Sequence, residues 1–264
     1  MVQTANVVTL KPRTVEAFEE YIREAEAGLA SSLRGSSAFL WSDTNAERAQ
    51  QVRQGKIVAQ LWAGDGPVTV HNGLIHDWVG AAWVPGATTQ RALALVQNYD
   101  NHRNIYQPEV IDSRLLSREG NDFRIFLRLL KKKIITVVLD TDHDVHYSRI
   151  AANRWFCRSH TTRIAEVEDA GTPKEKVLEP DTGYGFLWRL YSYWKFDERK
   201  ASVSPEHRGA TQQADGLYIE CRAISLTRDI PYGLGWIIEP IIRKLPGESL
   251  VRTLEATRQA LMIG

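Results

Sequence analysis

The chain has 264 residues, of which 43% are hydrophobic, so it is long enough to bury a full core. Its 33 Lys and Arg residues balance 32 Asp and Glu residues, which leaves no net positive field to hold nucleic acid or an anionic membrane surface. Two cysteines are too few for a disulfide framework or a cysteine-based metal cluster.

The sequence contains no stretch approaching the roughly 18 consecutive apolar residues of a transmembrane helix, so we expect no integral membrane segment. Residues 1–10 lack the basic and apolar regions of a signal peptide. The chain as given is therefore typical of a soluble, cytoplasmic protein. An exported protein whose leader had been removed would have the same features.

An amphipathic helix is predicted near the N-terminus. Five apolar residues recur at spacings of three and four and so share one helical face: Val15, Phe18, Ile22, Ala25 and Leu29. A second short helix is expected around residues 46–53. Because a single helix cannot bury such a face alone, we predict that residues 1–66 form a helical extension packed on a main domain at residues 67–264.

From Val68 onward the hydrophobic period changes to that of strands. Strand candidates follow in chain order at residues 68–84, 110–116, 123–130, 134–147, 149–167, 186–196 and 217–226. Thr88 is expected to cap one short helix after the first strand. Strands joined in sequence by turns indicate an antiparallel meander. The sixth strand would separate Cys157 from Cys221, so both thiols are predicted to be free.

A long helical pattern follows the last strand and runs to the C-terminus, with Ile237, Ile241 and Ile242 on its first apolar face. Pro246 and Gly247 interrupt this pattern, and a kink or a restart is expected there because proline removes a backbone hydrogen bond. The predicted fold class is α+β. A curved antiparallel sheet of about seven strands wraps around a long C-terminal helix, and a helical extension precedes it.

This order of elements resembles the helix-grip fold of the START-related superfamily, which holds lipid-transfer domains, polyketide cyclases and aromatases, and plant pollen-allergen carriers. The similar stretch runs from Val68 to Gly264. Its most specific pieces are the helical segment 85–100 with the aromatic loop 106–110, and the strand 110–128 with its turn at 117–120.

The resemblance implies a pocket between the sheet and the last helix for a hydrophobic or amphipathic small molecule. It transfers no catalytic residue, because the superfamily has no shared one. Residues 1–66 have no counterpart in the minimal fold.

A polar anchor for such a ligand is predicted on the central strands. Arg154, Phe156, Arg158 and His160 share one face of the strand at 149–167, and arginine binds carboxylates with two parallel hydrogen bonds. Arg128 is assigned to the same anchor. The alternative interpretation is a solvent-exposed face whose long cations prevent edge pairing.

Apolar walls are predicted from aromatic and aliphatic side chains. Trp188 and Trp194 share a face of the strand at 186–196, where aromatic residues at period two fit a core as well as a pocket wall. Ile237, Ile241 and Ile242 would face the cavity from the last helix.

Other chemically interesting groups receive structural interpretations. Acidic residues and histidines gather at Asp140, Asp142, His143, Asp144 and His146. Because the two histidines are an odd number of residues apart, they point to opposite faces of a strand, so we predict no metal and no cofactor.

The charged residues Glu220 and Arg222 and several isolated histidines and serines also lie outside any catalytic motif. Glu220 and Arg222 point the same way and are expected to form an internal charge pair. The other isolated residues are His71, His76, His102, Ser159, Ser192 and Ser225, and the serines lack the strand–turn–helix context of a nucleophile.

The leading hypothesis is a non-catalytic protein that binds or carries a hydrophobic or amphipathic small molecule. An enzyme on the same fold is the alternative, performing cyclisation, dehydration or hydrolysis with a His, Glu or Tyr in the pocket as general acid or base. A third possibility is an interaction module whose residues 1–66 engage a protein partner of unknown identity.

Overall fold

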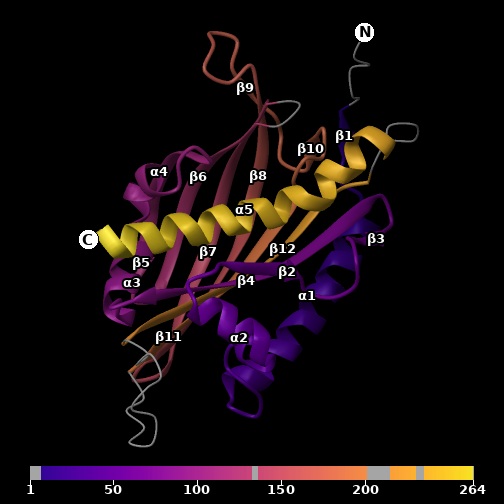
Figure 1. Cartoon of the computed structure of the whole chain (residues 1–264). Coiled ribbons are helices and arrows are strands. Elements are labelled where there is room, and N and C mark those ends of the chain that lie inside the picture. The colour runs from indigo at the N-terminus through magenta and orange to yellow at the C-terminus, as the bar shows by residue number, and fades with distance from the viewer. Residues whose placement is uncertain (1–6, 133–135, 201–214, 230–234, 264) are drawn as a thin grey trace, which may run out of the picture.

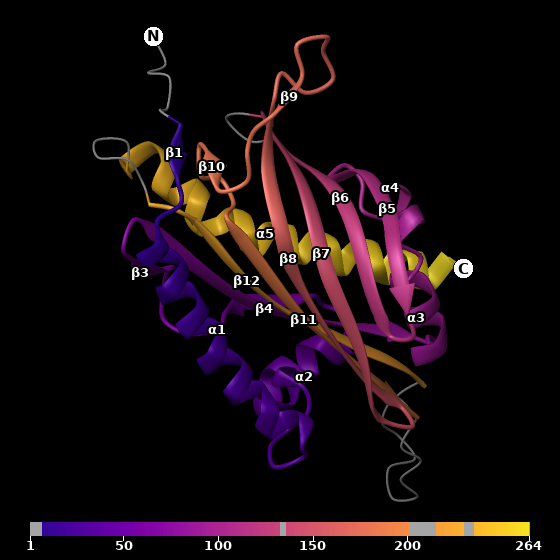
Figure 2. The same ribbon diagram turned by 180° about the vertical axis from the view of Figure 1, so that it is seen from behind.

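The computed structural model describes residues 7–132, 136–200, 215–229 and 235–263, with side chains for all of these except residues 235–243. The architecture is α+β, with one large antiparallel sheet and helices on both of its faces (Figures 1 and 2). Within the described chain, every helix is too short or too polar to cross a membrane.

The helices in chain order are α1 (Pro12–Leu33), η1 (Trp41–Thr44), α2 (Ala46–Arg53), α3 (Thr89–Val96), η2 (Tyr99–Asn101), α4 (His102–Ile105) and α5 (Gly235–Ile263). The strands are β1 (Val8–Thr9), β2 (Val58–Leu61), β3 (Val68–Val70), β4 (Gly73–Pro85), β5 (Val110–Glu119), β6 (Asp122–Lys132), β7 (Thr136–Ala151), β8 (Arg154–Glu168), β9 (Lys176–Val177), β10 (Thr182–Gly183), β11 (Arg189–Arg199) and β12 (Gly216–Arg228).

Seven long strands form the body of the sheet, which confirms the predicted fold class. The order across the sheet is β2-β4-β12-β11-β8-β7-β6-β5, with β3 paired to β4 and β9 paired to β8. From β5 to β12 the long strands lie in chain order, as an antiparallel meander requires. The first long strand, β4, pairs with the last, β12, and this pairing brings the beginning and the end of the meander together.

Helices cover the two faces of the sheet very differently. Helix α5 crosses one face, while α1 and α2 lie on the other (Figures 1 and 2). We call these the α5 face and the α1 face. Gly80 lies on the α5 face, because a Cβ atom there would be 2.8 Å from Leu254 Cδ1. The adjacent Val79 lies on the α1 face and packs in one cluster with Leu40 and Val52.

The N-terminal helix covers the α1 face with the predicted apolar stripe. Phe18 and Ile22 are buried in one cluster with Ile75 and Ile224 of the sheet. The Phe18 ring meets the Tyr191 ring edge-on, with 5.7 Å between their centroids. The α1 stripe is therefore buried against the sheet. The division into two domains at residue 66 stays a prediction, and β2, which precedes it, pairs with β4.

Two predicted elements differ from the structure. The strand expected at residues 68–84 is a hairpin of β3 and β4, because Asn72 adopts a φ of 52° and turns the chain. Of the two alternatives expected at Pro246, a kink or a restart, the restart is absent, since α5 is one helix from Gly235 to Ile263. At Gly247 the helix approaches the sheet so closely that a Cβ atom would lie 2.5 Å from Cζ3 of Trp78.

Both cysteines are free and buried, as predicted. Trp194 of β11 lies between them, paired in register with Cys157 on one side and Cys221 on the other. The order of the three strands therefore prevents a disulfide. Burial raises the pKa of Cys157 to about 12 and that of Cys221 well above its ordinary value.

Candidate functional site

Two neighbouring rows of side chains cross the α5 face of the sheet, with one residue from each strand. The histidine row consists of His76, Ser225, Leu190, Thr161 and His143. The serine row consists of Trp78, Ala223, Ser192, Ser159 and Val145. Most of these side chains are small or polar, although they belong to the central strands of the sheet.

Farther along the same face, beyond the histidine and serine rows, the strands carry large apolar side chains that pack against the C-terminal half of α5. Phe196 and Ile219 are buried there in one cluster with Leu250, Leu254 and Leu261. This part of the sheet–helix interface is a filled hydrophobic core. It anchors α5 to the sheet.

The serine row retains accessible surface where a core would exclude it. Ser159, Ser192 and Ala223 are only half-buried, whereas Phe196 and Ile219, four residues away on β11 and β12, are almost completely buried. A small side chain cannot fill the distance between a sheet and a helix that larger residues hold apart. The serine row therefore keeps accessible surface on the face that α5 crosses (Figure 1).

His76 at one end of the histidine row is neutral and has a free acceptor. Its Nε2 atom lies 3.1 Å from Oγ1 of Thr227. Thr227 Oγ1 also lies 3.2 Å from the Arg228 carbonyl oxygen, which can only accept. We therefore assign the hydroxyl hydrogen to that bond and the Nε2–H tautomer to His76, with a lone pair on Nδ1. Nδ1 is buried without a hydrogen-bond partner among the described residues. Burial lowers the pKa of His76 to about 4.

Trp78 supplies a buried donor two residues farther along the same strand. Its Nε1–H group has no hydrogen-bond partner in the described part of the chain. Its ring lies against α5 at Gly247, where any larger residue would collide with it. Nε1 of Trp78 and Nδ1 of His76 are thus two buried polar atoms of the site without a hydrogen bond among the described residues. A buried polar group left without a partner costs about 1–3 kcal/mol.

His143 closes the other end of the histidine row with the same chemistry. Its Nε2 atom lies 2.9 Å from Oγ1 of Thr141, which donates its hydrogen to the Leu127 carbonyl oxygen. His143 is therefore also the Nε2–H tautomer. Burial lowers its pKa to about 3, helped by the nearby His160 and His102. Both ends of the row are uncharged at neutral pH.

The predicted polar anchor lies on the opposite face of the sheet. Arg158 donates from Nε to Glu26 of α1 at 2.6 Å, and its Nη1 atom lies 3.1 Å from Nδ1 of His160. Phe156 packs in the cluster that contains the α1 side chains. The strand register places these three residues on the α1 face, so their expected position beside α5 is wrong.

The other two predicted cations are also held by carboxylates. Arg154 donates from Nε to Asp197 at 3.0 Å on the α1 face. Arg128 forms two hydrogen bonds with Asp140, at 2.7 and 2.9 Å, and a third with Glu175 at 3.0 Å. These hydrogen bonds raise the pKa of Arg128. Neither side chain faces the space below α5.

The predicted apolar walls are divided between the two faces. Trp194 packs against the cluster on the α5 face, and Trp188 belongs to the cluster under α1. The side chains of Ile237, Ile241 and Ile242 lie outside the described residues, although the backbone of α5 includes them.

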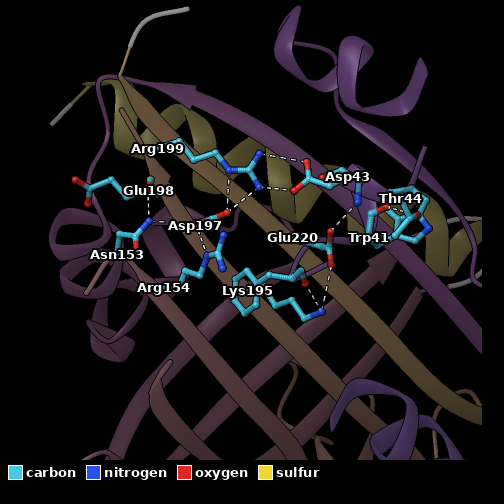
Figure 3. Close-up of polar contacts among 12 residues, drawn as sticks. Trp41, Asp43, Thr44, Asn153, Arg154, Lys195, Asp197, Glu198, Arg199 and Glu220 are labelled. Atoms are coloured by element: carbon cyan, nitrogen blue, oxygen red, sulfur yellow. Dashed lines mark hydrogen bonds and ion pairs between the residues drawn. The ribbon is translucent and has the colours of Figure 1, made fainter. Parts of the chain in front are cut away.

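A network of paired charges fills the interface between the α1 face and the N-terminal segment (Figure 3). Lys195 donates to the Phe39 carbonyl oxygen at 2.7 Å and lies 3.8 Å from Glu220. Glu220 also accepts from the backbone N–H of Ser42 at 3.2 Å. Burial raises the pKa of Glu220 and lowers that of Lys195, and the opposite charge of each partner counteracts both shifts.

Asp197 is the most deeply buried member of this network, with no exposed surface. It accepts hydrogen bonds from Nε of Arg154 and from Nε of Arg199, the latter at 2.8 Å. Arg199 continues the chain of contacts to Asp43 of the N-terminal segment (Figure 3). The network therefore joins β8 and β11 to η1.

Glu220 and Arg222 do not pair with each other as expected. Arg222 instead forms two hydrogen bonds with Asp77 of β4, at 2.9 and 2.6 Å, and Tyr21 of α1 donates to the same carboxylate at 2.8 Å. Both residues lie on the α1 face. Each of the two residues pairs with a residue of a different neighbouring strand, Glu220 with Lys195 of β11 and Arg222 with Asp77 of β4. These partners are distant in sequence, so the spacing of Glu220 and Arg222 does not predict them.

A separate open hollow of about 280 Å³ lies beside the edge strand β5. Its lining residues are Arg103, Asn104, Gln107, Pro108, Val110, Ile111 and Leu130. None of these belongs to the histidine or serine rows. Within the described residues, no group of three or more His, Cys, Asp or Glu side chains could hold a metal ion.

Sequence reasoning missed the residues that define this site. His76 was an isolated histidine, and Ser159, Ser192 and Ser225 lacked a catalytic motif. One signal was available: Ser192 interrupts an otherwise apolar, mostly aromatic face of its strand. Recognising the rows requires the pairing register, because the members come from five different strands.

No protein-family model matches the chain, and no curated protein matches it. Solved structures with similar folds include a STAR-related lipid transfer protein from Xanthomonas axonopodis, with 16% identity, a TM-score of 0.46 and coverage of 77% of this chain and 98% of the other. Zhui aromatase/cyclase from Streptomyces sp. R1128 is 10% identical, with a TM-score of 0.41 and coverage of 71% and 93%. Human STARD10 is 10% identical, with a TM-score of 0.40 and coverage of 81% and 79%. At these identities and TM-scores, the neighbours say nothing about what this chain binds.

Proposed function

We propose that the protein binds a hydrophobic or amphipathic small molecule, lipid-like or aromatic, in the space between the α5 face of the sheet and α5. The observation that carries this proposal is the accessible surface of Ser159, Ser192 and Ala223 in the middle of a sheet that a helix crosses. A protein interior is normally close-packed, so space at this position needs an occupant or a function.

The surroundings of this space support an apolar ligand. Trp78 and Trp194 border it from the sheet and pack against the hydrophobic cluster of the α5 face. Ligand sites are typically lined by aromatic and apolar side chains with a few polar groups that fix orientation. The row histidines, the serine hydroxyls and the indole N–H are such polar groups. Carriage of the ligand, in the sense of a lipid-transfer protein, belongs to the same proposal.

Catalysis on the same face has weaker support. A general base works best with a pKa near the working pH, and burial holds the pKa of His76 at about 4 and that of His143 at about 3. Both imidazoles are neutral at pH 7, but they are weak bases. A binding role uses their hydrogen-bonding capacity without requiring proton transfer.

Native mass spectrometry of freshly purified protein tests the proposal directly, by looking for a co-purified small molecule. A second measurement uses the fluorescent apolar probe N-phenyl-1-naphthylamine. Ala223→Leu places three additional carbon atoms in the proposed space, and we expect it to weaken probe binding at least about tenfold, or about 1.4 kcal/mol.

The matched control is Ala94→Leu on the exposed surface of α3, which should leave the affinity unchanged. Circular dichroism establishes that both variants are folded. Equal probe affinity in wild type and folded Ala223→Leu would reject the space above the serine row as the binding site.

A further inference from the structure

We propose that the ligand is an uncharged molecule with a hydroxyl group, held by the free acceptor of His76 and the free donor of Trp78, and that the site discriminates against carboxylates. This inference rests on the proposed function and adds the chemical class of the ligand to it. It replaces the carboxylate anchor that the sequence suggested, because those arginines lie on the α1 face.

The acceptor is fixed by a chain of three hydrogen-bonding groups. The Thr227 hydroxyl lies 3.2 Å from the Arg228 carbonyl oxygen, which can only accept, so we assign its hydrogen to that bond and assign His76 as the Nε2–H donor to Thr227. Only the lone pair of Nδ1 remains for another molecule. His76 is 1% exposed, and water in bulk does not satisfy this atom. A partner for it must donate a hydrogen, which a hydroxyl group does and a carboxylate does not.

The donor lies on the same face of the same strand. Trp78 follows His76 by two residues, so the two side chains are separated by roughly 7 Å along β4. Its indole N–H can only donate, and the matching ligand atom is a hydroxyl, ether or carbonyl oxygen. A hydroxyl oxygen both donates and accepts, and one or two such groups on an apolar body would satisfy His76 and Trp78 together.

The charges of the site also favour a hydroxyl group over a carboxylate. The described side chains of the two rows include no lysine or arginine, and the serines and threonine offer only neutral hydroxyl groups. The nearest predicted cations are held on the other face, as Arg158 is by Glu26 at 2.6 Å. A carboxylate entering this space would lose its hydration without gaining a counter-charge, and this desolvation is much more costly than that of a hydroxyl group.

Three ligands with the same naphthalene body and the same substituted position test the inference: 2-naphthol, 2-methylnaphthalene and 2-naphthoate, titrated calorimetrically at about pH 7.5, where the carboxylic acid is ionised. We expect 2-naphthol to bind about tenfold more tightly than 2-methylnaphthalene, because it satisfies buried groups that the hydrocarbon leaves unpaired. We expect 2-naphthoate to bind at least about tenfold more weakly than 2-naphthol.

Two variants assign the preference to the named atoms. Trp78→Phe removes the indole donor but keeps an aromatic ring, and His76→Leu removes the acceptor. In each folded variant, the advantage of 2-naphthol over 2-methylnaphthalene should fall below about threefold. Trp62→Phe is the matched control, since Trp62 is 40% exposed and belongs to neither row, and it should keep the wild-type ratio.

The outcomes separate this inference from the proposed function. Equal or tighter binding of 2-naphthoate, or equal binding of 2-naphthol and 2-methylnaphthalene, overturns the neutral-hydroxyl class while apolar binding stands. An unchanged ratio in both folded variants overturns the assignment to His76 and Trp78. Failure of all three molecules to bind wild-type protein overturns the proposed function and this inference together. The wild-type series decides the ligand class even if a variant does not fold.

Discussion

The two faces of one sheet use polar groups in opposite ways. On the α1 face, charged side chains are buried under the N-terminal segment, and Asp197, Glu220 and Arg222 each have partners of opposite charge. In the histidine and serine rows of the α5 face, the polar groups are neutral, and Nδ1 of His76 and Nε1 of Trp78 have no partner in the described chain.

This difference separates a structural interface from a binding surface. A buried charge needs a permanent partner, because leaving it unpaired costs several kcal/mol. A neutral buried group without a partner costs about 1–3 kcal/mol of folding free energy, and a stable domain tolerates this cost. A ligand that supplies the missing hydrogen bond offsets it. Mutations on the α1 face are therefore expected to change the free energy of unfolding, and mutations in the rows of the α5 face to change ligand affinity.

The largest expected effect comes from removing the apolar cover of the α1 face. Phe18 is 1% exposed, and Phe18→Ala should lower the free energy of unfolding by about 4 kcal/mol, through lost burial and a cavity. Chemical denaturation measures this change. Met262→Ala is the exposed control, at 61% exposure, and should change stability little. A loss below about 0.5 kcal/mol for Phe18→Ala would show that α1 does not stay on the sheet in solution.

The next effect tests the paired charges. Asp197→Ala leaves the guanidinium groups of Arg154 and Arg199 without the carboxylate that both contact. We expect a loss of about 3 kcal/mol in the free energy of unfolding, because one buried member of an ion network has been removed. Ligand affinity measured on the folded variant should stay unchanged. A stability equal to wild type would contradict a structural role for this network.

A smaller effect concerns the buried histidines and pH. Burial lowers the pKa of His102 to about 4, below the ordinary value of 6.5. Between pH 6.5 and pH 4 the unfolded chain therefore binds more protons than the folded protein. The contribution of His102 to the free energy of unfolding is fully present above pH 6.5 and decreases as the pH falls toward 4. From about pH 7 to pH 5 the contribution of one such histidine is on the order of 2 kcal/mol.

The variant His102→Gln isolates this contribution, since glutamine can still donate to the Val96 carbonyl oxygen that His102 contacts at 3.0 Å. Its stability should decrease less than that of wild type over the same pH range, measured by urea denaturation at both pH values. The comparison between the two proteins cancels the opposite contribution of Glu220, whose pKa is raised by burial. Identical pH profiles would show that His102 is not buried in the neutral form.

The smallest effect on stability is expected on the α5 face. Ser192→Ala removes a half-buried hydroxyl that no described residue uses, so the free energy of unfolding should change by less than about 0.5 kcal/mol. The same variant should alter the affinity for 2-naphthol if this hydroxyl lines the site. A destabilisation similar to that of Asp197→Ala would mean that the two faces do not differ as described.

The sequence predicts the architecture well because local patterns determine it. Period-two runs identify the long strands, and the stripe from Val15 to Leu29 identifies α1. The predicted cap at Thr88 is also present, since its side chain accepts from the backbone N–H of Arg91. The turn at Asn72 was missed, although Asn followed by Gly is a strong hairpin signal.

The orientation of the strands could not be predicted in the same way. Arg158 and Cys157 clearly point to opposite faces, but both faces of β8 are covered, one by α1 and the other by α5. A cation on a strand therefore gives no indication of which helix it faces. The partner of Arg158 is Glu26, 132 residues earlier in the chain, and no local pattern connects the two.

The burial of Cys157 and Cys221 has a practical consequence for spectroscopy. At 3% and 2% exposure and with raised pKa values, neither thiol presents a reactive thiolate at neutral pH. A cysteine introduced at an exposed position of α5, such as Met262→Cys, would then react selectively with a maleimide dye or a nitroxide label. The natural chain is thus already suited to measuring how far α5 moves from the sheet when a ligand enters.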